Sequence, residues 1–586
     1  MLYPLANIIM PEEKYKPFGS LFYTHFANKM YFNTWMNAFA AKKYNFYCEL
    51  GTLYIKIEAK GAYRLEVVGN NRQEGCPNED HVLVSQEVCD NACIAVPGAE
   101  RYDSVFLTII QDAENSAIIK GGCWCTDAKP LRENKMAVVS CTFKREDFIT
   151  KNVARFEQFL KDTPEMQGRL KLVVVDNGQT LPETITSENV ELYPNMNTGG
   201  AGGFTRGLME VMNKNEGYTH VLFMDDDVEM ITESFYRTLA ISDHLKEEYK
   251  DSFVGGAMLD IERRNNMYEA LAVHDGFFVR GLIQNLDVNH YENVMYSNRF
   301  SPDMFKPEAP FLSQGWWYCM FPISFAEKTG LPMPFFLRAD DVEWSWRASA
   351  LGTHFITLNG VFIWHAAFMW RVSKVTDYYY MQRNAFFMQV VHNPDFFRSF
   401  FKIHFNHTKE YILSTYDYSA IEIFIKALQD ILRGSAIFRE NPQIHCKILA
   451  ELNNSNQWID CSNEEELRMV AQRQTQPKNW RRNVYKWTKK GKYAPNFLRK
   501  KRAIALDWFP DPKTFQMTRS VKVYHLGNKK YSIRKYDAKR LQQYRKQMDD
   551  LINQIDLRYD EISQDIRNAY DEFRTQDFWK KYLNLQ

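Results

Sequence analysis

Short apolar runs that end in polar side chains constrain the fold of this chain more than any other feature. Residues 136–141 and 172–175 are almost continuously apolar, as expected for parallel strands buried on both faces of a sheet. A third run, 221–223, leads into an acidic triplet. Helix-length segments separate the runs, which predicts an α/β layer structure with a mostly parallel sheet. In such sheets the ligand crevice lies at the carboxyl ends of the strands.

The pattern on either side divides the chain of 586 residues into three predicted parts. Residues 1–130 hold short β-rich runs separated by Gly, Asn and Pro, which are typical of a β-sandwich or jelly-roll module. Residues 131–395 hold the alternating strands and helices, and residues 396–586 are helical in composition. From Tyr544 to Phe573 apolar residues recur every three or four positions, which predicts one long amphipathic helix packed within the chain or against another subunit.

Charge and composition exclude some classes of partner. A net charge of +1 gives no global field that would attract nucleic acid. The chain has no run of about 18 apolar residues, so a membrane-spanning helix is not expected. Its ten cysteines form no compact framework, which fits a reducing compartment. We therefore expect a cytoplasmic protein.

Residues 477–502 are rich in Lys and Arg, contain no acidic residue and include Trp480, Tyr485 and Trp487. This mixture suits an anionic membrane surface, where cations meet the headgroups and aromatic rings lie at headgroup depth. RNA binding uses the same residue types, and a solvated surface uses the charges alone. We expect a peripheral contact with the inner face of the cell membrane and no nucleic-acid partner.

The acidic triplet consists of Asp225, Asp226 and Asp227, placed where a buried strand ends. Mg²⁺ and Mn²⁺ take oxygen ligands and are often held by one or two carboxylates together with substrate phosphates. The triplet therefore indicates a nucleotide diphosphate held through a cation. The alternative for an acidic triplet is a solvated turn.

A glycine-rich segment runs from Asn197 to Phe204, before a helical pattern that begins near Arg206. Its glycines, among them Gly199 and Gly200, allow a close approach of the backbone and suit phosphate or sugar oxygens. The spacing matches neither a P-loop nor the dinucleotide-binding pattern. A flexible loop without a ligand is the alternative interpretation.

Three carboxylates, Asp340, Asp341 and Glu343, lie just before or at the start of a predicted helix. Capping by Asp340 accounts for one of them. A carboxylate near a donor sugar is able to take the proton of an attacking hydroxyl group, which is the task of a general base.

His365 follows the apolar run 360–363 and Trp364, so it lies at another predicted strand end. Its neutral imidazole suits a borderline cation such as Mn²⁺ beside carboxylates, although a lone histidine among aromatic residues is more often a packing residue. Trp316 and Trp317 are adjacent aromatic residues, able to stack on a sugar or to fill the core.

Taken in order, these motifs resemble inverting glycosyltransferases of family 2 with a GT-A fold, and most closely the bacterial galactofuranosyltransferases that polymerise cell-wall galactan. The similarity covers about residues 136–384. It rests on the following segments: Thr142-Phe-Lys-Arg145, Val175-Asp176-Asn177, Asn197 to Phe204, Phe223 to Asp227, Trp316-Trp317, Asp340-Asp341-x-Glu343, Trp364-His365 and Tyr379 to Asn384. Arg338-Ala339 departs from the pattern, because an aromatic residue is expected there.

The resemblance implies a role for each matching residue. The donor would be bound by Thr142, Arg145, Asp176, Asn197, Gly199, Gly200 and Asp226. Mn²⁺ or Mg²⁺ would be bound by Asp225, Asp227 and His365. Asp341 would be the base, and the acceptor would be bound by Trp316, Trp317, Asp340 and Glu343.

The function implied is transfer of galactofuranose from UDP-galactofuranose to a lipid-linked or cell-surface glycan, with inversion at the anomeric carbon. Two alternatives stay open at this point. The same fold with another nucleotide sugar, such as UDP-glucose, UDP-galactopyranose or a rhamnosyl donor, is one. A carbohydrate-binding or assembly protein without catalysis is the other. A homo-oligomer is expected from the β-module and the terminal amphipathic helix.

Overall fold

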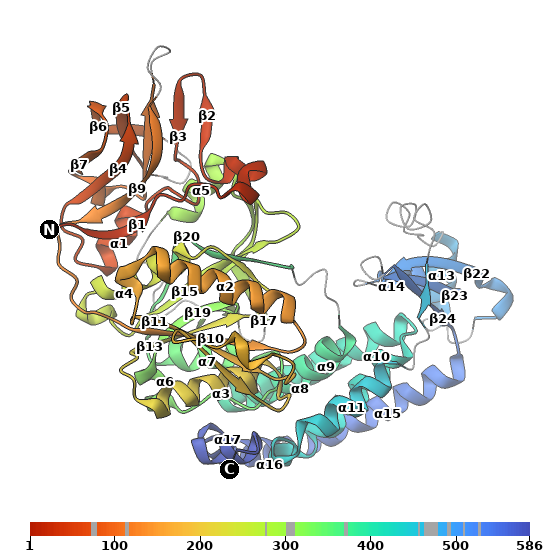
Figure 1. The fold of residues 1–586 in the computed structure, drawn as a ribbon. Coiled ribbons are helices and arrows are strands. Elements are labelled where there is room, and N and C mark those ends of the chain that lie inside the picture. Colours follow the sequence, from red (N-terminus) through yellow and green to blue (C-terminus); the bar gives the residue numbers. More distant parts are fainter. Residues whose placement is uncertain are drawn as a thin grey trace. The chain divides into compact units, whose positions relative to one another are not determined.

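The computed structural model describes residues 1–71, 79–111, 117–275, 278–299, 311–367, 373–454, 458–461, 479–488, 494–507, 510–525 and 529–585. It divides into two compact units (Figure 1). Unit 1 comprises Met1–Pro332 and Asp341–Ala367, and unit 2 comprises Met333–Asp340 and Phe368–Gln586. The β-module and most of the α/β region thus belong to one unit, and the three-part division at residues 130 and 395 stays a prediction.

The N-terminal module consists of two antiparallel sheets, in agreement with the predicted β-sandwich. One sheet has the order β1 (Tyr3–Asn7), β9 (Ile118–Thr126), β4 (Leu53–Lys60) and β7 (Ala92–Val96). The other has the order β2 (Thr24–Phe26), β3 (Lys29–Tyr31), β8 (Ser104–Ile110), β5 (Ala62–Asn71) and β6 (Glu79–Cys89). Trp124 of β9 stacks on Phe39, which in turn bridges to Val105 of β8. Aromatic packing therefore joins the two sheets.

The central sheet begins with four parallel strands: β12 (Val190–Pro194), β11 (Leu170–Asp176), β10 (Met136–Thr142) and β13 (His220–Asp225). Nearly every residue of the middle strands is buried, as the apolar runs predict. The register pairs Thr142 with Asp176 and Cys141 with Asp225. The polar ends of three strands therefore lie along one edge.

The sheet continues with strands of both directions. β19 (Tyr318–Pro322) is antiparallel to β13, and β15 (Phe253–Asp260) is antiparallel to β19. Beyond β15 lie β16 (Asn266–Asp275) and β17 (Phe278–Asp287), and β18 (Phe311–Ser313) pairs with β16. β20 (Phe355–His365) runs parallel to β15, which places its C-terminal residue at the same edge as Asp225. The predicted α/β class is confirmed, with a mixed rather than a mostly parallel sheet.

Helices α2 (Glu146–Asp162), α3 (Gly199–Lys214) and α4 (Glu233–His244) belong to this α/β region. In α2 the buried residues Ile149, Val153, Phe156 and Leu160 recur every three or four positions, so one face of the helix packs inward. Helix α3 lies against β10, where Gly203 and Gly207 allow a close approach to Cys141 and Val139.

Unit 2 is mainly helical. Its longer helices are α8 (Met381–His392), α9 (Pro394–Ser414), α10 (Tyr418–Ile431), α11 (Pro442–Asn453), α15 (Ala538–Leu557), α16 (Tyr559–Tyr570) and α17 (Gln576–Tyr582). The single long terminal helix predicted from periodicity is wrong, because the helix is interrupted at Arg558. Helix α15 packs on α9 and α10, and α16 packs on α8, so the apolar face is covered within the chain.

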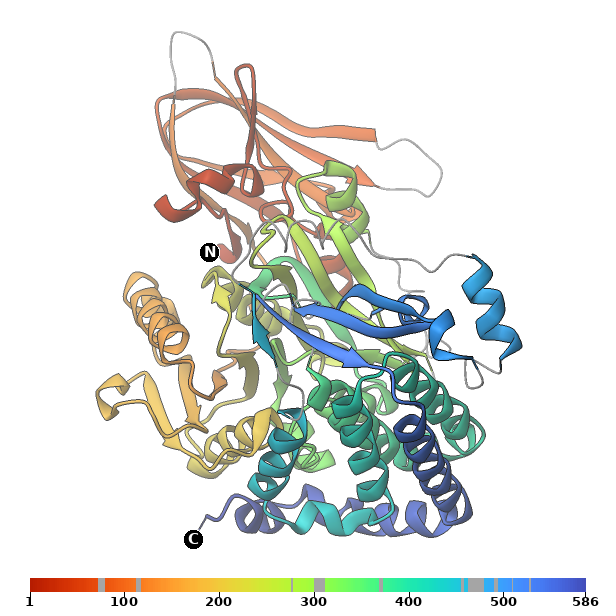
Figure 2. The same ribbon diagram turned by 90° about the vertical axis from the view of Figure 1, so that its right-hand side faces the viewer.

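Unit 2 also contains a small sheet that the predicted all-helical C-terminal region lacks (Figure 2). Its order is β21 (Ile459–Asp460), β24 (Lys530–Lys535), β23 (Thr518–His525) and β22 (Lys500–Leu506). Arg534 of β24 is buried and pairs with Asp507 and with Asp417, the N-cap of α10. The same Asp417 pairs with Lys374. This buried charge network ties the sheet to the helices.

The basic segment predicted to contact membranes is described only in part. Helix α13 (Asn479–Trp487) lies within it, and Trp480, Trp487 and Phe497 are 45%, 82% and 77% exposed. Residues 477, 478 and 489–493 lie outside the described part of the chain. Among the helices that the structure describes, none combines the length and the apolar character needed to cross a membrane.

Candidate metal centre and its surroundings

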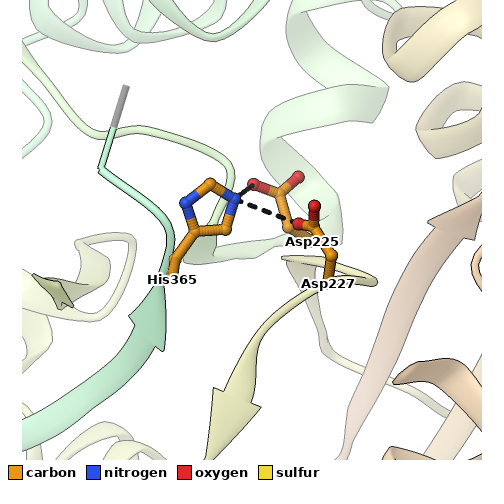
Figure 3. A group of neighbouring side chains, drawn as sticks. All are labelled: Asp225, Asp227 and His365. Atoms are coloured by element: carbon orange, nitrogen blue, oxygen red, sulfur yellow. Dashed lines mark ion pairs between the residues drawn. The ribbon is translucent and has the colours of Figure 1, made fainter. Parts of the chain in front are cut away.

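Three side chains predicted as metal ligands come together at the edge of the central sheet (Figure 3). Nε2 of His365 lies 3.0 Å from Oδ1 of Asp227 and 3.7 Å from Oδ2 of Asp225. One ligand atom from each residue lies within 4.8 Å of the other two. His365 is 2% exposed and Asp227 6%, whereas the side chain of Asp225 is 34% exposed.

A two-residue strand explains why the triplet meets His365. Asp225 is the last residue of β13, and the chain then turns into β14 (Glu229–Met230). β14 pairs with the end of β20, Glu229 opposite Trp364. On its other side β20 pairs with β15, Asp260 opposite His365. His365 is therefore fixed between two strands, directly beside the turn that carries Asp227.

The donor set fits a divalent cation. Carboxylate oxygens together with one imidazole nitrogen suit Mn²⁺ and are acceptable to Mg²⁺, and three protein ligands leave positions for water or a phosphate. Two carboxylates beside one another repel at short range, and a cation removes that repulsion. The partial exposure of Asp225 leaves one side of the group open.

The middle residue of the triplet has a different environment. Burial raises the pKa of Asp226 to about 7, the charges of Asp227 and Asp225 add to this shift, and the neighbouring Thr142 hydroxyl opposes it. Asp226 does not belong to the group of converging ligand atoms. Thr142 and Asp226, both predicted to bind the donor, are thus neighbours of each other at the strand ends.

Arg145 supplies a positive charge next to the acidic group. It occupies the N-cap position of α2, and its Nη2 lies 3.7 Å from Oδ2 of Asp227. Its side chain is 47% exposed, so the guanidinium group remains accessible. A guanidinium group beside a cation site is suited to bidentate contact with phosphate.

Asp176 and Asn197, both predicted to bind the donor, organise local backbone in this structure. Asp176 is buried at the end of β11, and its carboxylate accepts hydrogen bonds from the backbone N–H groups of Gly178, Thr180 and Leu181 at 2.7–2.9 Å. Oδ1 of Asn197 accepts a hydrogen bond from the N–H of Gly199 at 3.2 Å. Both residues therefore shape the loops at the strand ends.

The glycine-rich segment is helical earlier than predicted. Helix α3 begins at Gly199 rather than near Arg206. A Cβ atom on Gly202 would overlap the side chain of Thr198, and one on Gly203 would overlap Sγ of Cys141. Close packing thus requires these two glycines, while Gly199, with φ of 69°, makes the turn into the helix.

Asp340 and Asp341 open helix α7 (Asp340–Ala350) after a loop with unusual backbone geometry. Arg338 and Ala339 have φ of 69° and 62°, a left-handed conformation that costs energy for residues with a side chain. In unit 2, Nδ2 of Asn384 donates to the carbonyls of Phe335, Leu337 and Arg338 at 2.8–3.0 Å. The Arg383-Asn384 motif thus maintains the loop that leads to the two acids.

The charge of Asp341 acts on the pKa of Glu269, a carboxylate that the sequence motifs did not single out. Glu269 lies on β16, and burial raises its pKa to about 7, with the charge of Asp341 adding to the shift. β16 is hydrogen bonded to β15, the neighbour of β20. Within α7, Trp344 is fully buried against Phe321 and Phe325, which fixes the helix under the sheet.

Glu343, predicted to orient the acceptor, forms a buried ion pair. It is 1% exposed, and Arg347 donates from Nη2 to its Oε2 at 2.9 Å. Arg347 also donates to the carbonyls of Thr329, Gly330 and Leu331. This geometry favours a structural task for Glu343.

Trp316 and Trp317, predicted to form the acceptor wall, are 4% and 5% exposed. Trp316 makes edge contacts with Phe204 and Phe223, with ring centroids 5.4 and 4.9 Å apart. Nε1 of Trp317 donates to the carbonyl of Gly256 at 2.9 Å. Both rings pack as core residues, the alternative that the sequence left open.

Comparison with known proteins finds relatives in one class. The chain is similar to the galactofuranosyltransferase GlfT2 of Mycolicibacterium smegmatis, 25% identical over 427 residues, which is 69% of this chain and 64% of that protein. The galactofuranosyltransferase GlfT2 of Mycobacterium tuberculosis is 26% identical over 444 residues, 71% of this chain and 67% of that protein. No protein-family model matches the chain. The resemblance to galactofuranosyltransferases predicted from the motifs is confirmed.

Solved structures give weaker matches. TarS of S. aureus, residues 1–349, has a TM-score of 0.30 and 16% identity, over 50% of this chain and 80% of that one. Mannosyl-3-phosphoglycerate synthase of Rubrobacter xylanophilus has a TM-score of 0.24 and 14% identity, over 38% of this chain and 66% of that one. The fold assignment therefore rests on the strand order and register described above.

Proposed function

We propose that this protein is an inverting, metal-dependent glycosyltransferase that uses UDP-galactofuranose and a lipid-linked or polymeric glycan as acceptor. The observation that carries the proposal is the convergence of Asp225, Asp227 and His365 at the strand ends. The sequence similarity to two galactofuranosyltransferases supports the same class of donor.

In this proposal Asp225, Asp227 and His365 hold Mn²⁺ or Mg²⁺, which when bound supplies positive charge that stabilises a departing nucleoside diphosphate. Arg145 contributes a second positive charge to the diphosphate from the start of α2. Thr142, Asp176, Asn197, Gly199, Gly200 and Asp226 form the strand-end and helix-start segments against which the donor lies.

Asp341 is the proposed base. It takes the proton of the acceptor hydroxyl group as that oxygen attacks the anomeric carbon from the face opposite the diphosphate, so inversion needs no enzyme nucleophile. Asp340 lies beside it at the start of α7 as a proposed acceptor contact. Glu343, Trp316 and Trp317 act on the acceptor indirectly, by fixing the packing around α7 and β19.

The test is a transfer assay with purified protein, Mn²⁺ and a panel of UDP-galactofuranose, UDP-galactopyranose, UDP-glucose and a rhamnosyl nucleotide. We expect UDP release and chain extension with UDP-galactofuranose, and loss of transfer in Asp341→Asn with nearly unchanged donor affinity. Preference for another nucleotide sugar would replace the donor assignment. Failure to turn over any donor would leave a carbohydrate-binding protein instead.

Two further parts of the proposal concern contact with the membrane and the oligomeric state. The exposed Trp480, Trp487 and Phe497, among the basic residues of 479–488 and 494–502, support a peripheral contact with the inner face of the cell membrane. Binding to vesicles that contain anionic lipid, absent with neutral vesicles, tests it. Self-association into a homo-oligomer is proposed as well and is tested by sedimentation.

A further inference from the structure

A cavity lies at the end of β15 and β20 remote from the candidate metal centre. Its volume is about 290 Å³, and it lies between the turn after η5 (Glu247–Tyr249), helix α6 (Ile323–Thr329) and the turn that leads into β20. β15 and β20 pair from Phe253 opposite Phe355 to Asp260 opposite His365. At about 3.3 Å per residue, the two sites lie on the order of 20 Å apart.

The polar part of the cavity wall offers both donors and acceptors. Glu248 and Asp251 bring carboxylates, and Lys328 and Thr353 bring an ammonium and a hydroxyl group. Ser252 is 2% exposed, and its Oγ has no hydrogen-bond partner in the part of the chain that the structure describes. Because that Oγ is itself buried, the polar groups that a ligand in the cavity reaches first are those of Glu248, Asp251, Lys328 and Thr353.

The remaining wall is apolar or aromatic. Phe325 is almost fully buried, while Leu351 is 47% exposed at the rim. The ring of His354 stands edge-on to Tyr249, with centroids 4.9 Å apart. Burial lowers the pKa of His354, against the opposing charge of Glu248, so the imidazole is neutral near pH 7 and both donates and accepts hydrogen bonds.

These features select one chemical class of ligand. Two carboxylates disfavour phosphate groups and nucleotides. A volume near 290 Å³ lies at the lower end of the range for small-molecule sites, roughly 300–1,000 Å³, and suits one hexose-sized group. Hydroxyl groups need paired donors and acceptors, while the C–H face of a sugar needs an apolar surface, and this wall provides both.

We propose that this cavity is a secondary binding site for one neutral sugar residue of a glycan chain. The choice of the glycan, the chain that the enzyme extends, rests on the proposed function. A chain held here and at the metal centre is bound at two points, and the second contact is then intramolecular. Long acceptors therefore bind more tightly than short ones.

The experiment fills the cavity and compares acceptors of two lengths. Thr353→Trp and, separately, Ser324→Trp block the cavity from two sides, and Asp162→Asn on the exposed end of α2 is the control. Without donor, a labelled galactofuranose disaccharide, which is too short to span both sites, should show two binding sites on wild-type protein and one on each Trp variant. With donor, each Trp variant should have a KM for an acceptor long enough to span both sites that is at least threefold above the wild-type value. Its kcat and its KM for a disaccharide acceptor should stay unchanged.

Two binding sites on both Trp variants, or one on the wild type, would overturn the proposal. Thermal unfolding shows whether each variant is folded, so that loss of a binding site is not mistaken for misfolding. The second, independent substitution keeps the test available if one variant does not fold. If the wild-type protein transfers no sugar from any donor, the proposed function fails, and the binding titration still decides the cavity.

Discussion

Nε2 of His365 lies 3.0 Å from Oδ1 of Asp227, although His365 ends β20 and Asp227 lies in the turn between β13 and β14. This contact depends on β14, whose two residues pair with the end of β20. A buried imidazole and a buried carboxylate held so close, with Asp225 beside them, form a group whose ligand atoms could hold a metal ion.

Asp227→Asn should abolish stabilisation by Mn²⁺. A cation that binds only the folded state stabilises it by about 2.7 kcal/mol at a hundredfold excess over its Kd, which raises the unfolding temperature. Differential scanning calorimetry with and without Mn²⁺ measures the shift, and Asp162→Asn, an exposed acid, is the control that keeps it. An equal Mn²⁺ shift in Asp227→Asn would place the cation elsewhere.

Much of this centre follows from the sequence, for a physical reason. Strands buried on both faces are visible as apolar runs, and parallel strands bring their carboxyl ends to one edge, so Asp225 and His365 are predictable neighbours. The pairing of β14 is not predictable, because two residues carry no periodicity. Glu269 is missed for a similar reason: no motif surrounds this acid in β16, and its proximity to Asp341 is a tertiary effect.

The strands of the small sheet in unit 2 were not predicted, because they lie in a segment rich in Lys and Arg. In β23 the buried Val521 and Val523 flank Lys522, whose ammonium group lies over the rings of Tyr524 and Tyr531. This alternation has the period of a strand, but the density of Lys and Arg around it favours an interpretation as a solvated basic segment. The ion pair between Glu343 and Arg347, by contrast, has the i, i+4 spacing of a helix and is visible in the sequence.

Glu343→Gln should destabilise the fold more than it affects acceptor binding. Removal of one partner from a buried ion pair leaves the Arg347 guanidinium buried without its counter-charge, at a cost of about 3–5 kcal/mol. Thermal unfolding measures the loss, and Glu343→Gln with Arg347→Met should recover part of it. A rise in the KM for the acceptor at unchanged stability would instead indicate that Glu343 contacts the acceptor.

Glu269 should make stability depend on pH between about 4.5 and 7. Its pKa in the folded state is raised to about 7 by burial and by Asp341, above the ordinary value of a glutamate. The folded state then binds more protons than the unfolded state in this window, so stability falls as pH rises through it. The unfolding midpoint in urea, measured from pH 4.5 to 8, should decline less steeply in Glu269→Gln. Identical slopes for the variant and the wild type would contradict the raised pKa.

Gly203→Ala should loosen the contact between α3 and β10 and lower stability by about 1–3 kcal/mol, the usual cost of overpacking. The added methyl group would overlap Sγ of Cys141 on β10, and the cysteine has no room to move because the strand is paired on both sides. Cys141→Ala combined with Gly203→Ala should restore part of the stability, since it removes the overlapping sulfur atom but leaves Cβ of residue 141 only 2.8 Å from the added methyl group. Gly121→Ala is the matched control, because no atom lies within 4 Å of its added methyl group. If the double variant unfolds at the same temperature as Gly203→Ala alone, the overlap with Cys141 is not the cause.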